Sequence, residues 1–448
     1  MTTPGANVSI EVTGGTLRGG EVLVQGSKNA AQKVLPLTAL VPAEYEIARV
    51  PDIADTHAII DVLRHLGALV TYSDGTCLID TRDLANQPVP RALTQPATGT
   101  FLFAGVLLAR FGSSEVGLPG GDEIGARPVG LHLDLLRAVG TFADELEDSV
   151  TLRSPSLVGA PVKMPIPSTG ALMSIVAAAC LADGETVVER APWDTDIEAA
   201  FVFLRMLGVG IACTAHADDR YVDVTITPRD RGATAGRIHF ELPADRNDAA
   251  TWVIAGALAR EPVAIVGAPL SDLEPLIAVL ESAGCTIAIE GSNATVTRPR
   301  ELLSPVETVT VGASPLLHSD WAQVLSVALS QCRGTSRIVD TMYDARTSHL
   351  EPLARMGMTV RRGEVTVPRG TLMFDPGGER AASIEIDGPT ALRSTRAATQ
   401  DVRGSMALLL AGSIAAGHTR IDSLDQLRRG YEHLEARLGR LGVECRVL

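Results

Sequence analysis

Two acids, three glycines and an arginine share one short stretch of the sequence, LPGGDEIGARP, residues 118–128. Asp122 and Glu123 could hold or transfer a proton, and Arg127 could bind an anion. The glycines would leave the backbone conformationally free. A surface turn would need only the glycines, so the rest of the chain has to decide whether this stretch is a turn or a working loop.

Basic residues also stand where the sequence predicts the first turns of helices. A helix N-terminus carries unpaired N–H groups and a partial positive charge, so it attracts anions and disfavours lysine and arginine. For Asp55 and Asp272, which also fall in predicted first turns, ordinary helix capping is the favoured explanation. If several helix ends converge on one cleft, they form a site for a small anion. Function is the favoured explanation for five cations, Lys28, Arg127, Arg346, Arg403 and Arg429.

The composition limits which partners such a site could serve. The chain has 448 residues, 46% hydrophobic and 21% charged, which predicts a globular protein of two or three domains. Its net charge of −14 argues against nucleic acid as a partner. The six cysteines lack zinc-type spacing, and we find no signal-peptide pattern and no apolar run long enough to span a membrane. We therefore expect a cytoplasmic protein without a bound metal.

The elements that must position these residues recur along the chain. A helix with a leucine–glycine-like stop occurs six times, and its glycines follow one another at intervals of 68–85 residues. Each stop leads into a hairpin-like stretch such as ALVTYSDGTCLID, and a more apolar helix and a strand precede it. The spacing predicts six βαβαββ units, packed three by three into two α/β domains, with a linker near residues 229–237. The stopping glycines are Gly67, Gly140, Gly208, Gly284, Gly357 and Gly442.

Six motifs, in order and spacing, resemble the UDP-N-acetylglucosamine 1-carboxyvinyltransferase family of enolpyruvyl transferases. The sister family, 5-enolpyruvylshikimate-3-phosphate synthase, fits less well, because it expects serine at position 29 and a glycine-rich element near residues 96–101. The motifs are GSKNAA, LPGGDEIGARPVGLHL, HSDWAQ, YDAR, QDVRGS and RRGYE.

The resemblance covers essentially the whole chain and implies a particular fold. This fold is the inside-out α/β barrel, with two domains of three units each around a cleft. The C-terminal-type domain would be discontinuous, residues 1–26 and 238–448, and the N-terminal-type domain would comprise residues 27–237. The second of these would carry the mobile loop 118–128.

The resemblance also implies that the anion is phosphoenolpyruvate. Lys28, Arg127 and Arg429 would hold its phosphate. Arg346 and Arg403 would hold its carboxylate, for which a guanidinium fork is the natural partner. The basic side chains neutralise the phosphate, so neither a metal nor a cofactor is required.

The implied chemistry is an addition followed by an elimination. An acceptor hydroxyl attacks C2 while C3 takes a proton, and C3 then loses a proton as phosphate leaves. Lys28 and Arg403 would serve catalysis as well as binding, Asn29 would help place the substrate, and Asp320 is the candidate base for the acceptor hydroxyl.

Asp122 stands where many members of the resembled family carry cysteine. A carboxylic acid can deliver the C3 proton if its pKa is raised inside a closed site, so we interpret the stretch around Asp122 as a working loop and Glu123 as a solvent-facing neighbour. Fosfomycin acts on the family by alkylating the cysteine thiolate, and a carboxylate is a far weaker nucleophile. The sequence therefore predicts insensitivity to fosfomycin.

The acceptor is expected to be a uridine nucleotide, but the sequence departs from the family at its contacts. Thr98 and Ile166 replace an arginine and a lysine, Gly130 replaces an aspartate, and Arg428 replaces an acid. The acceptor contacts implied by the resemblance are Arg127, Pro128, Val129, Gly130, Leu131, Ser168, Thr169, Gly170, Asp320 and Met342.

Three interpretations of these departures remain open. A paralogue could have kept the phosphoenolpyruvate chemistry and taken a smaller nucleotide such as UMP, as in nucleoside-antibiotic metabolism, and we favour this interpretation. A divergent peptidoglycan enzyme could still use UDP-N-acetylglucosamine and replace the lost cations with Arg393 or Arg396. A non-catalytic nucleotide-binding paralogue is the third. The sequence leaves the oligomeric state open.

Overall fold

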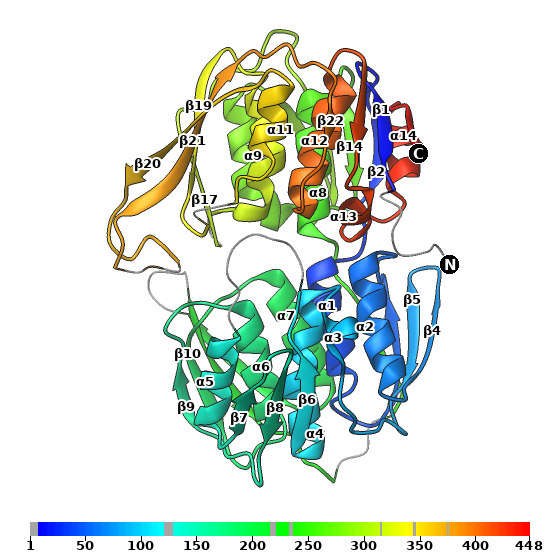
Figure 1. Cartoon of the computed structure of the whole chain (residues 1–448), viewed down its shortest axis with the longest axis vertical. Helices are drawn as coiled ribbons and strands as arrows, with labels where there is room; N and C mark the ends of the chain where they lie inside the picture. The colour runs from blue at the N-terminus through cyan, green and yellow to red at the C-terminus, as the bar shows by residue number, and fades with distance from the viewer. Residues whose placement is uncertain are drawn as a thin grey trace. The chain divides into compact units, whose positions relative to one another are not determined.

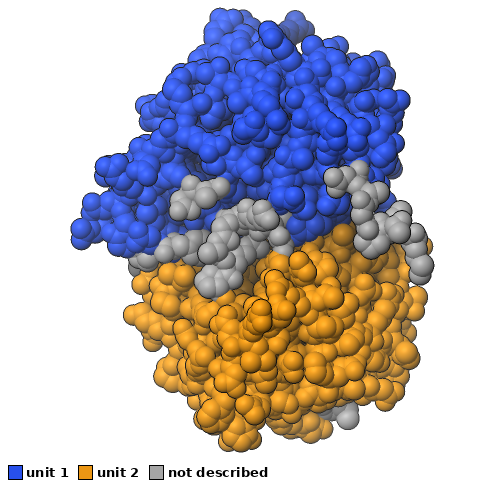
Figure 2. All heavy atoms as spheres, in the orientation of Figure 1, with its two compact units in different colours: residues 1–25, 122–125, 244–448 blue, residues 26–121, 126–243 orange. Residues whose placement is uncertain are grey.

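The computed structural model describes residues 8–120, 129–215, 221–232, 236–313, 316–343, 346–373, 375 and 377–448. The loop residues Asp122, Arg127 and Pro128 lie outside this part of the chain. Over the described residues, unit 1 comprises residues 8–25 and 244–448, and unit 2 comprises residues 26–120 and 129–243 (Figure 2). No helix in the described part is long and apolar enough to cross a membrane.

Unit 2 contains three small sheets among its described residues, with strand orders β13-β3-β5-β4, β6-β8-β7 and β11-β12-β10-β9. Its strands are β3 (Glu44–Ala48), β4 (Leu69–Ser73), β5 (Thr76–Asp80), β6 (Ser113–Gly117), β7 (Phe142–Glu145), β8 (Ser149–Arg153), β9 (Pro161–Lys163), β10 (Thr186–Ala191), β11 (Gly210–Ala215), β12 (Val222–Thr227) and β13 (Ile238–Glu241). Its helices are α1 (Lys28–Leu37), α2 (Ala54–His65), α3 (Arg91–Thr94), the 3₁₀ helix η1 (Thr98–Leu102), α4 (Phe103–Phe111), α5 (Gly130–Ala138), α6 (Thr169–Ala179) and α7 (Thr195–Met206) (Figure 1).

Unit 1 also contains three sheets in its described part, with orders β22-β23-β1-β24, β15-β16-β14-β2 and β18-β17-β19-β21-β20. Its strands are β1 (Ile10–Thr13), β2 (Gly20–Leu23), β14 (Val263–Val266), β15 (Thr286–Glu290), β16 (Asn293–Thr297), β17 (Val309–Gly312), β18 (Leu317–His318), β19 (Gly334–Asp340), β20 (Thr359–Thr366), β21 (Arg380–Gly388), β22 (Arg396–Ala397), β23 (His418–Ile421) and β24 (Cys445–Val447). Its helices are α8 (Arg246–Leu258), α9 (Leu270–Ser282), η2 (Ser319–Trp321), α10 (Ala322–Leu329), α11 (Leu350–Arg355), α12 (Val402–Ile414), α13 (Leu424–Arg428) and α14 (Leu434–Arg440).

The first strands of the chain belong to unit 1. β1 pairs antiparallel with β23 and β24, and β2 pairs in parallel with β14. The sequence placed the return to this domain at residue 238, but the structure places it at residue 244. The reason is strand β13, which pairs in parallel with β3 of unit 2 and so remains in that unit.

All six predicted stopping glycines have left-handed backbone angles, with φ between 76° and 104°. Each follows the last turn of a helix, α2, α5, α7, α9, α11 or α14 respectively, and its N–H bonds the carbonyl three residues earlier. A side chain at such a φ would be strained, so glycine ends each helix where the following strand must turn away. The predicted repeat is therefore visible in the backbone of both units.

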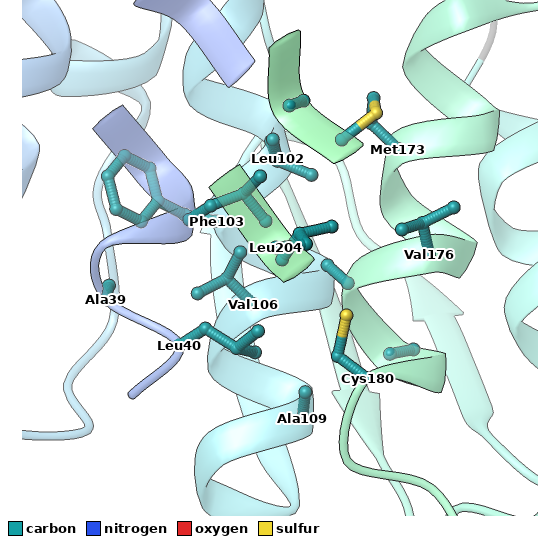
Figure 3. Close-up of a cluster of buried hydrophobic side chains, with 14 of the residues drawn as sticks. Ala39, Leu40, Leu102, Phe103, Val106, Ala109, Met173, Val176, Cys180 and Leu204 are labelled. Atoms are coloured by element: carbon teal, nitrogen blue, oxygen red, sulfur yellow. The ribbon is translucent and has the colours of Figure 1, made fainter. Parts of the chain in front are cut away.

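The apolar helix of each repeat forms the core. In unit 2, α4 packs against α6, and Val106 and Ala109 lie near Val176 and Cys180 in the buried cluster of Figure 3. A methyl group on Gly105 would lie 2.6 Å from the Ser174 carbonyl oxygen, so the two helix backbones approach too closely for any other residue. In unit 1, α8, α10 and α12 are buried along almost their whole length, and α10 packs against both of the others. This packing fixes where the helix N-termini stand in each unit.

Candidate functional site

Arg346 is the centre of an ion-pair cluster in unit 1. Its Nε donates to Asp401 Oδ2 at 2.8 Å and its Nη2 to Asp401 Oδ1 at 3.2 Å, while its Nη1 donates to Asp320. Asp401 is the N-cap of α12, and Asp320 lies in η2 just before α10. The start of each inner helix therefore supplies one carboxylate to the same guanidinium. We call Asp320, Arg346, Asp401 and Arg403 the Arg346 cluster.

Arg403, in the first turn of α12, provides the second cation of this cluster. Its Nε lies 4.0 Å from Asp320 Oδ2, and its guanidinium lies 5.1 Å from the ring centre of Tyr431. The side chain is buried, yet its Nη1 has no hydrogen-bond partner among the described residues. A buried cation with an unused donor is suited to an anionic ligand, because pairing would recover the hydrogen bond that it gave up on leaving water.

Asp320 is ionised and firmly held in this arrangement. Burial would raise the pKa of Asp320, but the positive charges of Arg346, His318 and Arg403 outweigh burial and hold that pKa well below its ordinary value. Asn247, near the start of α8, donates to Asp320 Oδ2 at 3.3 Å and accepts from the Trp321 indole at 2.8 Å. With these partners Asp320 is a poor proton acceptor, since a strongly lowered pKa weakens a general base.

Two predictions of local position are wrong. Arg346 and Arg429 were expected in the first turns of helices, but α11 begins only at Leu350 and α14 only at Leu434. Arg346 therefore lies in the connection between β19 and α11, and Arg429 is the C-cap of α13, where its Nη1 donates to Gln426 Oε1 at 2.8 Å. The short helix α13 had no counterpart in the sequence pattern.

The corresponding ion-pair cluster of unit 2 contains a lysine as its cation, whereas the cluster of unit 1 contains arginines. Lys28 is the first residue of α1, and its Nζ lies 2.8 Å from Asp55 Oδ2 in α2. Ser27 caps α1 by accepting from the Ala30 N–H at 3.1 Å, and its hydroxyl donates to Asp196 at 2.5 Å. We call Ser27, Lys28, Asp55 and Asp196 the Lys28 cluster. Asp55, expected as an ordinary cap, is the buried counterion of Lys28.

The predicted acceptor contacts in unit 2 come from two neighbouring helix starts. Val129 and Gly130 open α5, while Ser168 caps α6 and accepts from Ala171 N–H at 3.3 Å. His132 of α5 joins these helix starts, because its Nδ1 lies 2.9 Å from Ser174 Oγ of α6 and its ring lies against Gly170. Burial lowers the pKa of His132 to about 4, so its imidazole is neutral near pH 7.

Several residues of the site were missed in the sequence. Asn247 donates to Asp320 of the Arg346 cluster and accepts from Trp321, and the ring of Tyr431 lies against Arg403. His132 connects α5 with α6, the two helices at whose starts the predicted acceptor contacts lie. Asn247 had a usable signal, because it follows Asp245 and Arg246 at the start of an apolar helix as Asn29 follows Lys28. Among the described residues, no group of three histidine, cysteine or acidic side chains is placed to hold a metal ion.

Comparison with known proteins identifies the class to which this fold and these clusters belong. Residues 12–438 match the EPSP synthase family, 3-phosphoshikimate 1-carboxyvinyltransferase. The chain belongs to this family and is an enolpyruvyl transferase.

Within the family, this chain is similar to enzymes named for UDP-N-acetylglucosamine. The UDP-N-acetylglucosamine 1-carboxyvinyltransferase of Chlorobium limicola is 30% identical over 97% of this chain and 96% of its own. The enzyme named UDP-N-acetylglucosamine 1-carboxyvinyltransferase 2 in Carboxydothermus hydrogenoformans is 31% identical over 95% of this chain and 96% of its own. The resemblance stated from the sequence motifs is thereby confirmed.

Solved structures confirm the fold. The enolpyruvyl transferase NikO from Streptomyces tendae superposes with a TM-score of 0.84 at 22% identity, over 98% of this chain and 99% of NikO. EPSP synthase from Acinetobacter baumannii superposes with a TM-score of 0.72 at 16% identity, over 98% and 100% of the two chains. The predicted inside-out α/β barrel with two domains is thus correct.

Proposed function

We propose that this enzyme transfers the enolpyruvyl group of phosphoenolpyruvate to a hydroxyl of a small uridine nucleotide such as UMP, with release of phosphate, in specialised metabolism. The observation that carries the reaction is the Arg346 cluster, in which two buried arginines adjoin one carboxylate and Arg403 keeps a donor that no other described residue uses. Charge-assisted hydrogen bonds to an anion are the strong kind, so such a pair suits a carboxylate.

In this proposal Arg346 and Arg403 bind the carboxylate of phosphoenolpyruvate, and Lys28, Arg127 and Arg429 bind its phosphate, with Asn29 placing the substrate. Two features of the described residues support these roles. Lys28 is buried with a counterion, and Arg403 is buried beside an aromatic ring. A cation held at a helix start, away from bulk water, has to be stabilised by its neighbours, which is typical of a binding site and untypical of a surface.

The ion pairs of Asp320 suggest at which stage of the reaction it becomes a stronger base. A substrate carboxylate that takes up Arg346 and Arg403 would compete with Asp320 for the same guanidinium groups. The pKa of Asp320 would then rise, because the charges that lower it would be shared with the new anion. Asp320 would accept the proton of the acceptor hydroxyl as that oxygen adds to C2, while Asp122 would give a proton to C3. In the second step C3 would lose a proton and the C2–O bond to phosphate would break, which restores the double bond.

The choice of acceptor rests on basic residues that the resembled family carries and this chain lacks. Ile166, two residues before the cap of α6, is half-buried and apolar, and Gly130 at the start of α5 has open space around it. The replacement Arg396 is exposed, and its Nε donates to Asp422 at 2.5 Å. A cation that is already paired offers less to a diphosphate, so these features favour an acceptor with fewer phosphate charges. UDP-N-acetylglucosamine, which the relatives' names contain, is the second candidate.

The test is phosphate release from phosphoenolpyruvate, with UMP and UDP-N-acetylglucosamine supplied side by side. We expect turnover with UMP and at least about a hundredfold lower kcat/KM with the UDP-sugar, equivalent to about 3 kcal/mol for two lost charge contacts. Turnover with the UDP-sugar at an ordinary rate would replace the first candidate with the second. Nucleotide binding without any phosphate release would favour the non-catalytic interpretation.

A further inference from the structure

Asn247 lies beside Asp320, the candidate base, but takes no part in the proposed reaction. It is the second residue of α8 and is 1% exposed. Its backbone N–H donates to Oδ1 of the helix cap, Asp245, at 2.8 Å, and its carbonyl accepts from Thr251 Oγ1 at 2.9 Å. The backbone of Asn247 is therefore fixed by the start of α8, and its side chain is left to bond residues outside this helix.

The orientation of the Asn247 amide follows from the chemistry of its two partners. The indole N–H of Trp321 can only donate, so the side-chain oxygen of Asn247 faces it, at 2.8 Å. The amide nitrogen then faces Asp320 Oδ2 at 3.3 Å, and an ionised carboxylate can only accept. Turning the amide over would break both hydrogen bonds. Trp321 therefore directs the N–H donor of Asn247 toward the carboxylate of Asp320.

Asn247 differs from the other side chains that hold Asp320, because it carries no charge. Arg346 Nη1 donates to Asp320 Oδ1, and Arg403 Nε lies 4.0 Å from Oδ2. In the proposed reaction both arginines also bind the carboxylate of phosphoenolpyruvate, which would weaken their bonds to Asp320. The Asn247 amide, held by Trp321, would keep its bond to Oδ2. A neutral donor can fix the direction of a carboxylate while lowering its basicity less than a guanidinium does.

The backbone around Asp320 is fixed separately from its side chain. Ser319 donates its hydroxyl to Asp340 Oδ2 at 3.0 Å, and the N–H of Asp320 donates to His318 Nδ1 at 3.2 Å. Asp340 Oδ1 also accepts the N–H of Met342, the other acceptor contact predicted in unit 1, at 2.8 Å. The side chain of Asp320 is 23% exposed, so a substrate can reach it. Its remaining freedom is the rotation of the carboxylate.

We propose that Asn247 is a positioning residue for Asp320, which keeps Oδ2 directed for proton acceptance while the arginines bind substrate, and that Trp321 fixes the amide for this role. The proposal rests on the proposed function, in which Asp320 takes the proton of the acceptor hydroxyl as that oxygen bonds to C2. Asn247 neither gains nor loses a proton in this step. Its substitution should therefore lower kcat more than it alters substrate affinity.

The decisive variant is Asn247→Asp, which keeps the side-chain volume and the bond from Trp321 but loses the donated bond. We expect kcat for phosphate release to fall by about 10- to 100-fold, with both KM values within about threefold of the unaltered protein. The acceptor is whichever of UMP and UDP-N-acetylglucosamine the unaltered protein uses faster. A purely structural asparagine would give a lower melting temperature with kcat unchanged.

The pH dependence of kcat is a readout that a structural role would not move. A second carboxylate beside Asp320 disfavours its ionised form, so Asn247→Asp should raise the pKa of Asp320. The base acts when ionised, so kcat is lost as the pH falls through that pKa, and the loss should begin about one pH unit higher in the variant. An unshifted profile would count against the proposal. The charged and titratable groups that face Asp320 or its arginines are the same in both proteins: His318 of β18, Asp245 at the start of α8, Asp340 of β19, Arg346, and Asp401 and Arg403 of α12.

A double-mutant cycle tests the part of Trp321. Trp321→Phe removes the indole N–H and leaves the Asn247 amide able to turn, so kcat should fall by about three- to tenfold. In the Asn247→Leu background the same change should alter kcat by less than about twofold, because the amide that Trp321 orients is gone. Trp252→Phe is the matched control. It removes another buried indole bond near the start of α8, to Asp248 Oδ1 at 2.9 Å, and should leave kcat within about twofold.

The outcomes separate this proposal from the proposed function. If the unaltered protein turns over but folded Asn247→Asp and Asn247→Leu proteins keep its kcat, Asn247 does not position the base and the proposal is wrong. Fully additive losses at positions 247 and 321 would overturn the part assigned to Trp321. If the unaltered protein releases no phosphate with either nucleotide, the proposed function is wrong and this proposal falls with it.

Discussion

The Arg346 cluster of unit 1 and the Lys28 cluster of unit 2 hold their cations in different ways. Arg346 makes a two-pronged bond to Asp401 and a further bond to Asp320, so three of its donors are fixed in one plane. Lys28 meets Asp55 through a single ammonium group, and Gln32 shares that carboxylate at 2.9 Å. A guanidinium fork fixes direction as well as charge, whereas an ammonium group fixes charge alone.

This difference indicates which hydrogen-bond donors of each cluster are available to a ligand. In unit 1 the structural bonds of Arg346 orient the cluster, and Nη1 of Arg403 beside it has no hydrogen-bond partner within the described part of the chain. In unit 2 the ammonium of Lys28 can turn among partners, because its flexible stem and three donors impose little geometry. We therefore expect the Arg346 cluster to recognise a planar carboxylate and the Lys28 cluster to recognise a less directional phosphate charge.

The largest expected effect is on catalysis, from Arg403→Ala. Removing two charge-assisted hydrogen bonds, about 1.5–3 kcal/mol each, should lower kcat/KM for phosphoenolpyruvate by at least about a hundredfold. Cooperative unfolding should be retained. Steady-state phosphate release measures the effect, and Arg446→Ala, in an exposed pair with Glu11, is the control. A loss of less than tenfold would show that Arg403 does not bind the substrate.

The second-largest difference between the two clusters should appear in the free energy of unfolding. Arg346→Met leaves the buried carboxylate of Asp401 and the half-buried one of Asp320 without their shared cation and should lower the free energy of unfolding by about 3–5 kcal/mol. Lys28→Met leaves Asp55 bonded to Gln32 and should lower it by about 1–3 kcal/mol. Urea unfolding of both variants measures the difference. Equal losses would contradict the contrast, and adding Asp55→Asn to Lys28→Met should recover part of the loss.

The pH dependence of the free energy of unfolding should distinguish the two ion-pair clusters from the histidines His349 and His132. Burial lowers the pKa of His349 and of His132 to about 4, so between pH 6.5 and 4 the unfolded chain takes up protons that the folded chain does not. The free energy of unfolding should fall over that range, by up to about 3 kcal/mol for His349. Asp320 and Asp401 have lowered pKa values, so the stability they contribute is present above about pH 4 and is lost below it.

Denaturant unfolding at pH 7, 5.5 and 4.5 measures the histidine part of this response. His349→Phe should reduce the fall in unit 1, and His132→Phe should reduce the smaller fall in unit 2, where the ring is half-buried. A flat stability between pH 7 and 4.5 would show that the two imidazoles are not neutral in the folded protein.

The smallest expected effect is that of fosfomycin, which should be none. Asp122 offers a carboxylate where the antibiotic requires a thiolate, so no time-dependent inactivation is expected. Intact-mass measurement after prolonged incubation checks this outcome, and Asp122→Cys should gain both inactivation and a covalent adduct. An adduct on Asp122 in the unaltered protein would contradict the prediction and would place a strong nucleophile in the loop.

The sequence was most informative where a local rule acts. The six stopping glycines could be predicted because a left-handed helix end requires glycine whatever surrounds it. The starts of α1, α6, α8 and α12 could be predicted because Ser27, Ser168, Asp245 and Asp401 are capping residues ahead of apolar runs. The short helix α13 and the late start of α11 escaped prediction because neither has a cap or a long apolar period.

The sequence by itself determined the repeats, the reaction class and the cations that could serve it, because helix ends, charges and motif order are written in local residue types. Only the tertiary structure decided which carboxylate each cation meets. Asp320 and Asp401 are 81 residues apart in sequence, and Arg346 joins them only because α10 and α12 pack side by side. The same packing leaves Oε1 of Gln323 and both ring nitrogens of His349 buried without a hydrogen-bond partner among the described residues, since burial follows from the contacts of distant elements and from no local pattern.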